Sequence, residues 1–241
     1  MYIQITTRCN LSCDHCLFDC TEQGEDMAIE TFQAACEYDE PSIGGGEPTL
    51  HPQFADILRI AMDHTYDGSV GIITNGTQTT WAKLLMYMAK AGVVWARLSE
   101  DSYHPWYAVD DEVRRGFTEM SALNNTTDGR EPMYVGRAIK TYYDGVDPRE
   151  VRRELIGCDC NNLLVKPNGD IHHCSCPGAR KIGDVWCGID PDKEERFRSE
   201  DGEWLCHTRK NWDEICEQWH RDNDTPEELE EYLAEYGSVL V

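Results

Sequence analysis

Hydrophobic and polar positions change period repeatedly along the first two-thirds of the chain. Short runs rich in β-branched and apolar residues predict strands at residues 2–6, 41–43, 70–73, 93–98, 133–139 and 162–165. Between them, apolar residues at helical spacing predict helices at residues 29–38, 54–64, 81–91, 110–123 and 147–156. Strands that alternate with helices are typical of an α/β fold with a parallel sheet, and right-handed connections let that sheet curl into an open barrel. Such barrels place their chemistry on the loops that follow the strands.

The last third of the chain has a different texture. Cysteines recur, and regular periodicity fades until an acidic helix that we expect at residues 225–236. An Asn-Gly pair at residues 168–169 predicts the turn of a β-hairpin. We therefore divide the chain into a barrel core at residues 1–156 and a small cysteine-rich extension at residues 157–241, which includes the last barrel strand.

Composition narrows the class of protein. The chain has 241 residues, of which 40% are hydrophobic, enough for a sizeable core. The 22 Lys and Arg against 45 Asp and Glu give a net charge of −23, which disfavours binding of extended nucleic-acid backbone. No run of roughly 18 apolar residues predicts a membrane span, and the strand-like run at residue 2 leaves no room for a signal peptide. We therefore expect a cytoplasmic protein with no membrane partner.

The cysteine content points to metal chemistry. Twelve cysteines fit either a secreted disulfide protein or thiolate ligation of metal, and the chain is too long for a small disulfide-stapled scaffold. Cys9, Cys13 and Cys16 follow the first predicted strand at the spacing C-x3-C-x2-C. Three thiolates on one loop can hold a [4Fe–4S] cluster with one open iron, or a structural zinc ion with Cys20 as the fourth ligand. This spacing alone leaves both alternatives open.

A glycine-rich loop follows the second predicted strand. Gly44, Gly45 and Gly46 precede Glu47 in the sequence GGGEPT. Successive glycines let backbone N–H and C=O groups approach a ligand closely, although a plain flexible turn is the alternative interpretation. A glycine loop placed one β–α step after a three-cysteine loop favours ligand binding.

Together, the segments CNLSCDHC and GGGEPT resemble the radical S-adenosylmethionine (radical SAM) enzymes, with His15 in the aromatic slot of the cysteine motif. The resemblance extends through the element order to about residue 166 and implies a partial (β/α)6 TIM-like barrel. It also implies that Cys9, Cys13 and Cys16 hold a [4Fe–4S] cluster whose open iron binds S-adenosylmethionine (SAM). An electron donor such as flavodoxin or ferredoxin would reduce the cluster, so that SAM is cleaved to a 5′-deoxyadenosyl radical that abstracts hydrogen from a substrate.

Further residues carry over from this resemblance one by one. It assigns cofactor-binding roles to Gly44, Gly45, Gly46, Glu47, Asn75, Ser99, Asp101, Gly136 and Arg137. The glycine loop corresponds to the segment that receives the methionine amino group, and the serine and the aspartate correspond to groups near the ribose and the methionine carboxylate. Gly136 and Arg137 correspond to the segment that contacts adenine, and Arg137 can also pair with the methionine carboxylate. Tyr103 and His104 are the candidates to face substrate during catalysis, with an ordinary surface loop as the alternative.

The second group of cysteines resembles part of another known element. Cys158 and Cys174 form the pattern C-x10-G-x4-C, which resembles the first half of a SPASM extension or its shorter "twitch" form. Those extensions carry auxiliary iron–sulfur clusters, but the full second half of the SPASM pattern is absent, so we expect at most one. Its candidate ligands are Cys158, Cys174, Cys176, Cys187 and Cys206. A zinc knuckle or buried thiols are the alternative, and His172 and His173 keep the zinc option open.

Three functional hypotheses follow. The first is a radical SAM enzyme that acts on a peptide or amino-acid-type substrate, because most relatives with such an extension act on peptides. The second is radical modification or isomerisation of a nucleoside or a modified nucleic-acid base, which suits a compact barrel with a pocket for one small substrate. The third is a structural zinc or iron–sulfur protein without catalysis, which would not cleave SAM.

Overall fold

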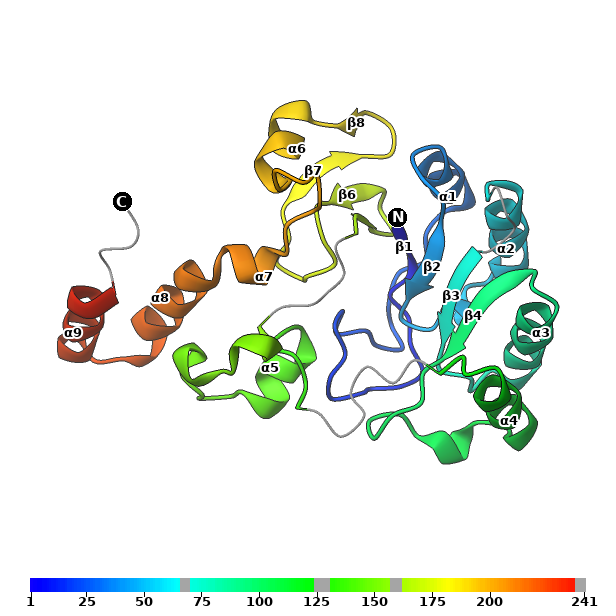
Figure 1. Ribbon diagram of the computed structural model, residues 1–241, viewed down its shortest axis with the longest axis horizontal. Coiled ribbons are helices and arrows are strands. Elements are labelled where there is room, and N and C mark those ends of the chain that lie inside the picture. Colours follow the sequence, from blue (N-terminus) through cyan, green and yellow to red (C-terminus); the bar gives the residue numbers. More distant parts are fainter. Residues whose placement is uncertain (66–69, 124–130, 157–161, 237–241) are drawn as a thin grey trace.

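The structure is a computed structural model that describes residues 1–65, 70–123, 131–156 and 162–236. One mixed sheet runs through it in the strand order β4-β3-β2-β1-β5-β6-β7-β8. Figure 1 shows helices along one side of the strands β1 to β4 and the later part of the chain extending away on the other side of β1. The fold is therefore mixed α/β and barrel-like, with a sheet that stays open between its edges β4 and β8.

The parallel half of the sheet contains the first four strands, which are β1 (Tyr2–Thr6), β2 (Ser42–Gly45), β3 (Val70–Thr74) and β4 (Val94–Leu98). The helices that accompany them are α1 (Ile29–Cys36), α2 (Phe54–Asp63), α3 (Thr79–Lys90) and α4 (Asp111–Glu119), with short 3₁₀ turns η1 (Pro48–Leu50) and η2 (Trp106–Ala108) in the loops. The strands and helices predicted up to residue 123 are confirmed, with shifts of a few residues at their ends.

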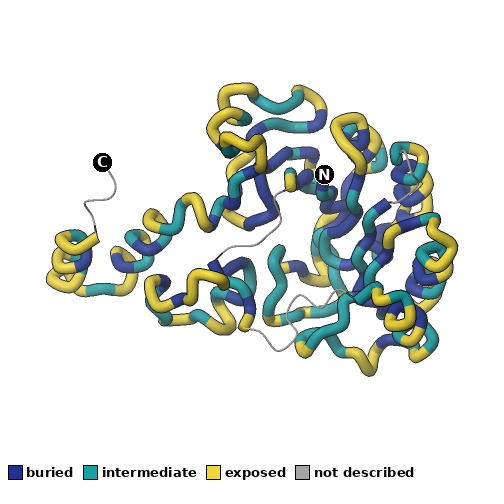
Figure 2. Tube along the Cα trace, viewed as in Figure 1, coloured by how far each residue is buried: buried dark blue, intermediate teal, exposed yellow. Residues whose placement is uncertain are grey.

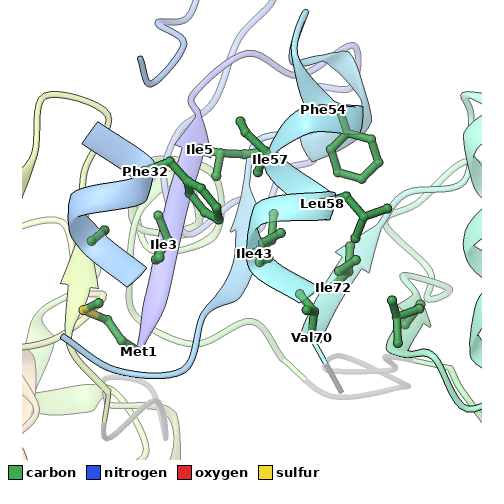
Figure 3. Close-up of a cluster of buried hydrophobic side chains, with 14 of the residues drawn as sticks. Met1, Ile3, Ile5, Phe32, Ile43, Phe54, Ile57, Leu58, Val70 and Ile72 are labelled. Carbon is green, nitrogen blue, oxygen red and sulfur yellow. The ribbon is translucent and has the colours of Figure 1, made fainter. Parts of the chain in front are cut away.

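The main core lies between this sheet and its helices. Ile3 and Ile5 of β1, Ile43 of β2 and Ile72 of β3 point to the helix side, where they are fully buried with Phe32 of α1 (Figure 3). Because side chains alternate along a strand, the remaining strand residues face the other side of the sheet. The parallel strands therefore have one apolar face covered by helices and an opposite face, on which Gln4 of β1 is buried and Trp95 of β4 is half exposed.

The fifth predicted strand, at residues 133–139, is wrong. Only a single parallel bridge between Tyr134 and Ile156 forms there, and helix α5 (Arg137–Tyr142) begins directly afterwards. Gly136 has a φ of +57°, a backbone conformation that glycine adopts readily and other residues rarely do. This turn redirects the chain into a helix before a strand can extend.

The helix predicted at residues 147–156 is also wrong. The segment forms two separate 3₁₀ turns, η3 (Pro148–Glu150) and η4 (Arg153–Leu155). Val151, between them, has an extended backbone with φ −71° and ψ 128°. This extended residue interrupts the helical spacing of the apolar side chains.

The sheet continues beyond β1 with four short strands, which are β5 (Leu164–Val165), β6 (Asp170–His172), β7 (Lys181–Asp184) and β8 (Gly188–Ile189). β5 runs parallel to β1, and the last three strands are antiparallel to their neighbours. The predicted hairpin is confirmed between β5 and β6, with Gly169 at a φ of +87°. The expected division of the chain at residue 157 lies outside the described residues and stays a prediction.

The end of the described chain is helical. Its helices are α6 (Pro191–Phe197), α7 (His207–Lys210), α8 (Trp212–Asn223) and α9 (Pro226–Tyr236). Thr225 and Glu228 bond reciprocally across the first turn of α9, a capping box that confirms the predicted acidic helix. Figure 2 shows mostly exposed positions along α9, in contrast to the buried strands of the parallel half. No described helix is long and apolar enough to cross a membrane.

Candidate active site

A pocket of ≈ 270 Å³ lies at the carboxyl ends of the parallel strands. The loops after β1, β2, β3 and β4 all contribute to it, because the carboxyl ends of parallel strands meet at one edge of a sheet. Its lining consists of Tyr2, Cys9, Leu11, Cys13, His15, Cys16, Leu17, Phe18, Cys20, Gly45, Gly46, Ile73, Thr74, Asn75, Ser99 and His104. The structure thus brings together residues from four of the predicted loops.

The three predicted cluster ligands all line this pocket. Backbone N–H groups already point at two of the sulfurs, since Leu11 donates to Cys9 Sγ at 3.4 Å and Cys20 donates to Cys16 Sγ at 3.4 Å. The Cys20 thiol beside Cys16 lowers the pKa of Cys16 to about 6, whereas burial raises the pKa of Cys9 to about 11. Backbone N–H···S contacts of this kind stabilise thiolates and the clusters that they hold.

The glycine loop packs against the start of the cysteine loop. The N–H of Gly46 donates to Thr6 O, and the N–H of Glu47 donates to Arg8 O, both at 2.8 Å. A Cβ at Gly45, where φ is +135°, would lie 2.1 Å from Thr6 O, and one at Gly46 would lie 2.1 Å from Arg8 O. The close approach that requires glycine is therefore to the backbone of the cysteine loop, and it leaves Gly45 and Gly46 on the pocket wall.

Glu47 lies beneath the pocket rather than on its lining. Its side chain is fully buried, and burial raises the pKa of its carboxyl group. The carboxylate accepts hydrogen bonds from the Thr49 hydroxyl at 2.5 Å, the Thr74 hydroxyl at 2.8 Å and the Asn75 N–H at 2.7 Å. It therefore fastens the loop after β2 to the end of β3. A contact between Glu47 and the methionine amino group stays a prediction.

Asn75 connects the loop after β3 to the cysteine loop. Its side-chain amide donates to Asn10 Oδ1 at 3.1 Å and lies 3.9 Å from Cys9 Sγ, while its Oδ1 accepts from the Thr77 N–H at 3.0 Å. These bonds orient the amide at the pocket wall. Ser99, whose N–H donates to Thr74 O at 2.9 Å, lines the same wall.

Asp101 anchors the loop after β4. Its Oδ1 accepts from the His104 ring at 2.8 Å and from the Tyr103 N–H at 2.9 Å. Burial raises the pKa of Asp101, but the His104 ring outweighs it, and the pKa falls to about 2. Burial likewise lowers the pKa of His104, yet the hydrogen bond to Asp101 brings it up to about 9. The two side chains thus form an ion pair at neutral pH.

The second carboxylate oxygen of Asp101 has no hydrogen-bond partner, although it is fully buried. It lies 3.8 Å from His15 Nε2, and the donor atoms of His15, Asp101 and His104 lie within 4.8 Å of one another. The Tyr103 ring packs against the His15 ring, with 4.7 Å between the ring centroids and a tilt of 41°. Burying a polar oxygen without a hydrogen-bond partner costs free energy. This atom is therefore suited to accept a hydrogen bond from a hydroxyl group of a bound molecule.

Gly136 and Arg137 hold the cysteine loop in place. The Arg137 guanidinium donates to the carbonyl oxygens of Cys13 at 2.8 Å and Cys20 at 2.6 Å, and its backbone N–H donates to Cys16 O at 2.9 Å. A Cβ at Gly136 would lie 2.5 Å from Cys16 O. Neither residue lines the pocket, so their predicted contacts with SAM stay predictions.

A second buried cysteine group lies in the later part of the chain. Cys176 Sγ is 3.8 Å from Cys206 Sγ, and Cys174 Sγ accepts from the His207 N–H at 3.3 Å. Cys187 is exposed at the β7–β8 turn, outside this group, and Cys158 lies outside the described residues. Of the histidines that kept a zinc site open, His172 bonds Ala179 O, and His173 bonds Arg180 O through Nδ1 while its buried Nε2 has no hydrogen-bond partner.

Several pocket residues escaped the sequence analysis, among them Tyr2, Leu11, Leu17, Phe18, Ile73 and Thr74. Tyr2 is the clearest case, because its hydroxyl accepts a hydrogen bond from the Gly45 N–H at 2.8 Å and its ring stacks on Phe18. The period-two pattern of β1, in which Tyr2 and Gln4 alternate with isoleucines, was the signal that could have found it.

Residues 3–125, slightly more than half of the chain, match the family model described as "Radical SAM superfamily". The chain belongs to the radical SAM superfamily. This radical SAM protein is 26% identical over 219 residues to the mycofactocin maturase MftC of Mycolicibacterium smegmatis, with 84% of this chain and 50% of the relative covered. It is 34% identical over 102 residues to a tungsten-containing aldehyde ferredoxin oxidoreductase cofactor-modifying protein of Pyrococcus furiosus. That match covers 39% of this chain and 28% of the relative.

A third relative is the S-adenosylmethionine-dependent nucleotide dehydratase of Selenomonas ruminantium, 30% identical over 110 residues and covering 43% of this chain and 39% of the relative. The chain thus spans half or less of the length of these curated relatives. Among solved structures, a crystal structure of BtrN in complex with AdoMet and 2-DOIA is 12% identical, with a TM-score of 0.48 and 76% of each chain covered.

Membership in the superfamily implies a [4Fe–4S] cluster and SAM, and the residues of the pocket fit both groups. The three motif cysteines share one wall, where N–H groups point at two of their sulfurs. Gly45, Gly46, Asn75 and Ser99 line the same pocket, and the unpartnered buried oxygen of Asp101, which does not itself line it, lies 3.8 Å from His15, which does. Since the superfamily is established for this chain, the protein is an enzyme, and a purely structural zinc site at these cysteines is no longer the better interpretation.

Proposed function

We propose that the enzyme uses Cys9, Cys13 and Cys16 to hold the [4Fe–4S] cluster and abstracts hydrogen from a peptide or amino-acid-type substrate. The single observation that carries the cluster assignment is that these cysteines line one pocket with Gly45, Asn75 and Ser99. When bound, the cluster supplies the electron that cleaves SAM to a 5′-deoxyadenosyl radical. The residues of the chain bind and orient the cofactor and exclude water.

Each part of the pocket has a proposed role. The backbone of Gly45 and Gly46 receives the methionine end of SAM, positioned by Glu47 from beneath. Asn75, Ser99 and the free oxygen of Asp101 bind polar groups of SAM such as the ribose hydroxyls. His104 and Tyr103 face the substrate, because their rings pack beside His15, and His15 and His104 both line the pocket.

The substrate class rests on the extension. Most relatives with a SPASM-like or twitch-like extension act on peptides, which favours the peptide or amino-acid class. A nucleoside or nucleotide is the second candidate, favoured by the match to a nucleotide dehydratase. We also propose one auxiliary iron–sulfur cluster on the group of Cys174, Cys176 and Cys206, with Cys158 as a further ligand, an electron donor such as flavodoxin or ferredoxin, and a cytoplasmic location.

Anaerobic reconstitution tests the proposal. We expect the wild-type protein to bind iron and sulfide and to form 5′-deoxyadenosine from SAM under reducing conditions, whereas Cys13→Ala forms none. Cys36→Ala is the matched control, because Cys36 is buried in the main core on α1. Formation of 5′-deoxyadenosine by Cys13→Ala at the wild-type rate would refute the assignment of the cluster. Deuterium transfer into 5′-deoxyadenosine from labelled peptides, compared with labelled nucleosides, decides the substrate class.

A further inference from the structure

The face of the parallel sheet opposite the helices carries an unusual pair of side chains on β4. Val94, Ala96 and Leu98 of this strand are buried in the main core with the helices, so Trp95 and Arg97 point to the opposite face. The Arg97 guanidinium lies 4.5 Å from the centroid of the Trp95 ring, a cation–π contact, and the indole is 49% exposed. A large, half-exposed aromatic ring and a cation thus stand together on the face of β4 opposite the main core.

The strand register shows what lies beside this pair. Trp95 is opposite Gly71 of β3, which is in turn opposite Ser42 of β2. A Cβ added to Gly71 would lie 2.8 Å from Ser42 Oγ, which confirms that both residues face the same side as Trp95. Two adjacent strands therefore have no side chain larger than serine at this level. Gly71 and Ser42 thus form a surface of small residues beside the indole, which we call the floor.

This floor leads to the pocket described above. Arg97 is opposite Ile73 in the register of β3 and β4, and Ile73 lines the pocket. Ser99, two residues further along the same strand end, lines it as well. Arg97 therefore lies on the same face of the sheet as the cofactor site, between two residues that line it: Ile73 on the adjacent strand and Ser99 further along its own chain.

The charge of Arg97 has no partner of opposite sign in the part of the chain that the structure describes. Two cations on the neighbouring helices are paired, since Lys83 of α3 lies 2.7 Å from Glu112 and Arg114 of α4 lies 2.6 Å from Glu100. The chain has 45 acidic residues against 22 basic ones, so carboxylates are plentiful. A guanidinium to which the described residues supply no carboxylate, beside a half-exposed indole, is suited to bind an anion that arrives from outside.

From this arrangement we infer that Arg97 binds an anionic group of the substrate, a carboxylate or a phosphate, while the floor beside Trp95 accommodates the adjoining part of the molecule. The inference rests on the proposed function, because it names the group by which the substrate is held next to the SAM site. A guanidinium can donate two parallel hydrogen bonds to either oxyanion, so both sources share one chemistry. With an amino-acid-type substrate, the carboxylate is the expected group.

Equilibrium binding to the reconstituted protein with SAM, in the absence of reductant, tests this inference. The carboxylate arm compares N-acetyl-alanyl-alanine with its C-terminal amide, and the phosphate arm compares cytidine 5′-monophosphate with cytidine. We expect the charged member of one arm to bind about tenfold more tightly than its neutral counterpart, the scale of a charge-assisted bidentate contact. A preference in the phosphate arm supports the inference and moves the proposed substrate class to nucleotides.

Variants of Arg97 test whether this residue causes the preference for the charged ligand. Arg97→Gln should abolish it and leave binding of the neutral member unchanged, and Arg97→Lys, which keeps the charge but not the fork, should retain part of it. Arg115→Gln, on the exposed side of α4, is the matched control and should behave as wild type. Equal binding of charged and neutral members by the wild type, or a preference that survives in Arg97→Gln, would overturn the inference. Because no turnover is needed, a protein that shows the Arg97 preference but never cleaves SAM would refute only the proposed function.

Discussion

The Oε2 atom of Glu47 accepts a hydrogen bond of 2.7 Å from the backbone N–H of Asn75, inside the protein and out of contact with solvent. This bond joins the loop after β2 to the loop after β3, and both loops form the pocket. The acid of the glycine motif therefore shapes the cofactor site by holding two of its walls together.

Replacement of this carboxylate should damage the site without direct loss of a ligand-lining group. In Glu47→Gln, the amide nitrogen displaces an acceptor, so at least one of the donors from Thr49, Thr74 and Asn75 is left unsatisfied in the interior. We expect a loss of about 1–3 kcal/mol in the free energy of unfolding, and weaker binding of SAM. Denaturant unfolding and calorimetry measure the two effects. Glu119→Gln, on the exposed end of α4, is the control. Wild-type stability in Glu47→Gln would contradict the bridging role.

Gly45 offers a test of the close approach between the glycine loop and the cysteine loop. In Gly45→Ala the new Cβ meets Thr6 O at 2.1 Å, and φ of +135° is strained for alanine. We expect a loss of about 3 kcal/mol or more, together with weaker SAM binding. Gly92→Ala also places a Cβ at a positive φ, but +70° lies in the left-handed region that alanine tolerates better than +135°, and nothing lies within 4 Å of the Cβ, so it should cost only about 1–2 kcal/mol. Equal losses in the two variants would mean that the contact with Thr6 is unimportant.

The second cysteine group can be tested through its iron. If Cys206 is a ligand of an auxiliary cluster, Cys206→Ala should lose iron and sulfide per chain while the SAM-binding cluster remains. Cys187→Ala should keep the wild-type content, because Cys187 is exposed and stands apart from Cys174, Cys176 and Cys206. Iron and sulfide assays after anaerobic reconstitution measure both. Loss of iron in Cys187→Ala but not in Cys206→Ala would reverse the assignment.

Acid stability should depend on Asp101. The pKa of its carboxyl group is about 2 in the folded chain and 3.8 without its partners. A carboxyl group whose pKa is lowered by folding stabilises the folded protein at any pH above its pKa in the unfolded chain. This contribution disappears as the pH falls from 3.8 towards 2. Denaturant unfolding of the cluster-free chain should show a steeper loss of stability over that window in the wild type than in Asp101→Asn. Asp201→Asn, at an exposed turn, should follow the wild type. Identical pH profiles for Asp101→Asn and wild type would contradict the ion pair with His104.

The sequence by itself determined the family and the first half of the fold. The three cysteines belong to one short loop, and the glycines and Glu47 belong to another, so their spacing is visible without any tertiary contact. The strands from β1 to β4 and their helices also follow from local periodicity, because one face of each element is buried in a common core.

Tertiary contacts decided the rest, because they join residues that are far apart in the chain. Arg137 bonds Cys13 O across 124 positions, and the left-handed turn at Gly136 replaces a predicted strand with helix α5. The separation of Cys187 from Cys206 depends on how the β7–β8 hairpin folds. Local patterns report which face of an element is buried, but the partner of a polar side chain depends on which distant segment folds against it. That is why the role of Glu47 as a bridge, and the lack of a carboxylate partner for Arg97 among the described residues, emerged only from the folded chain.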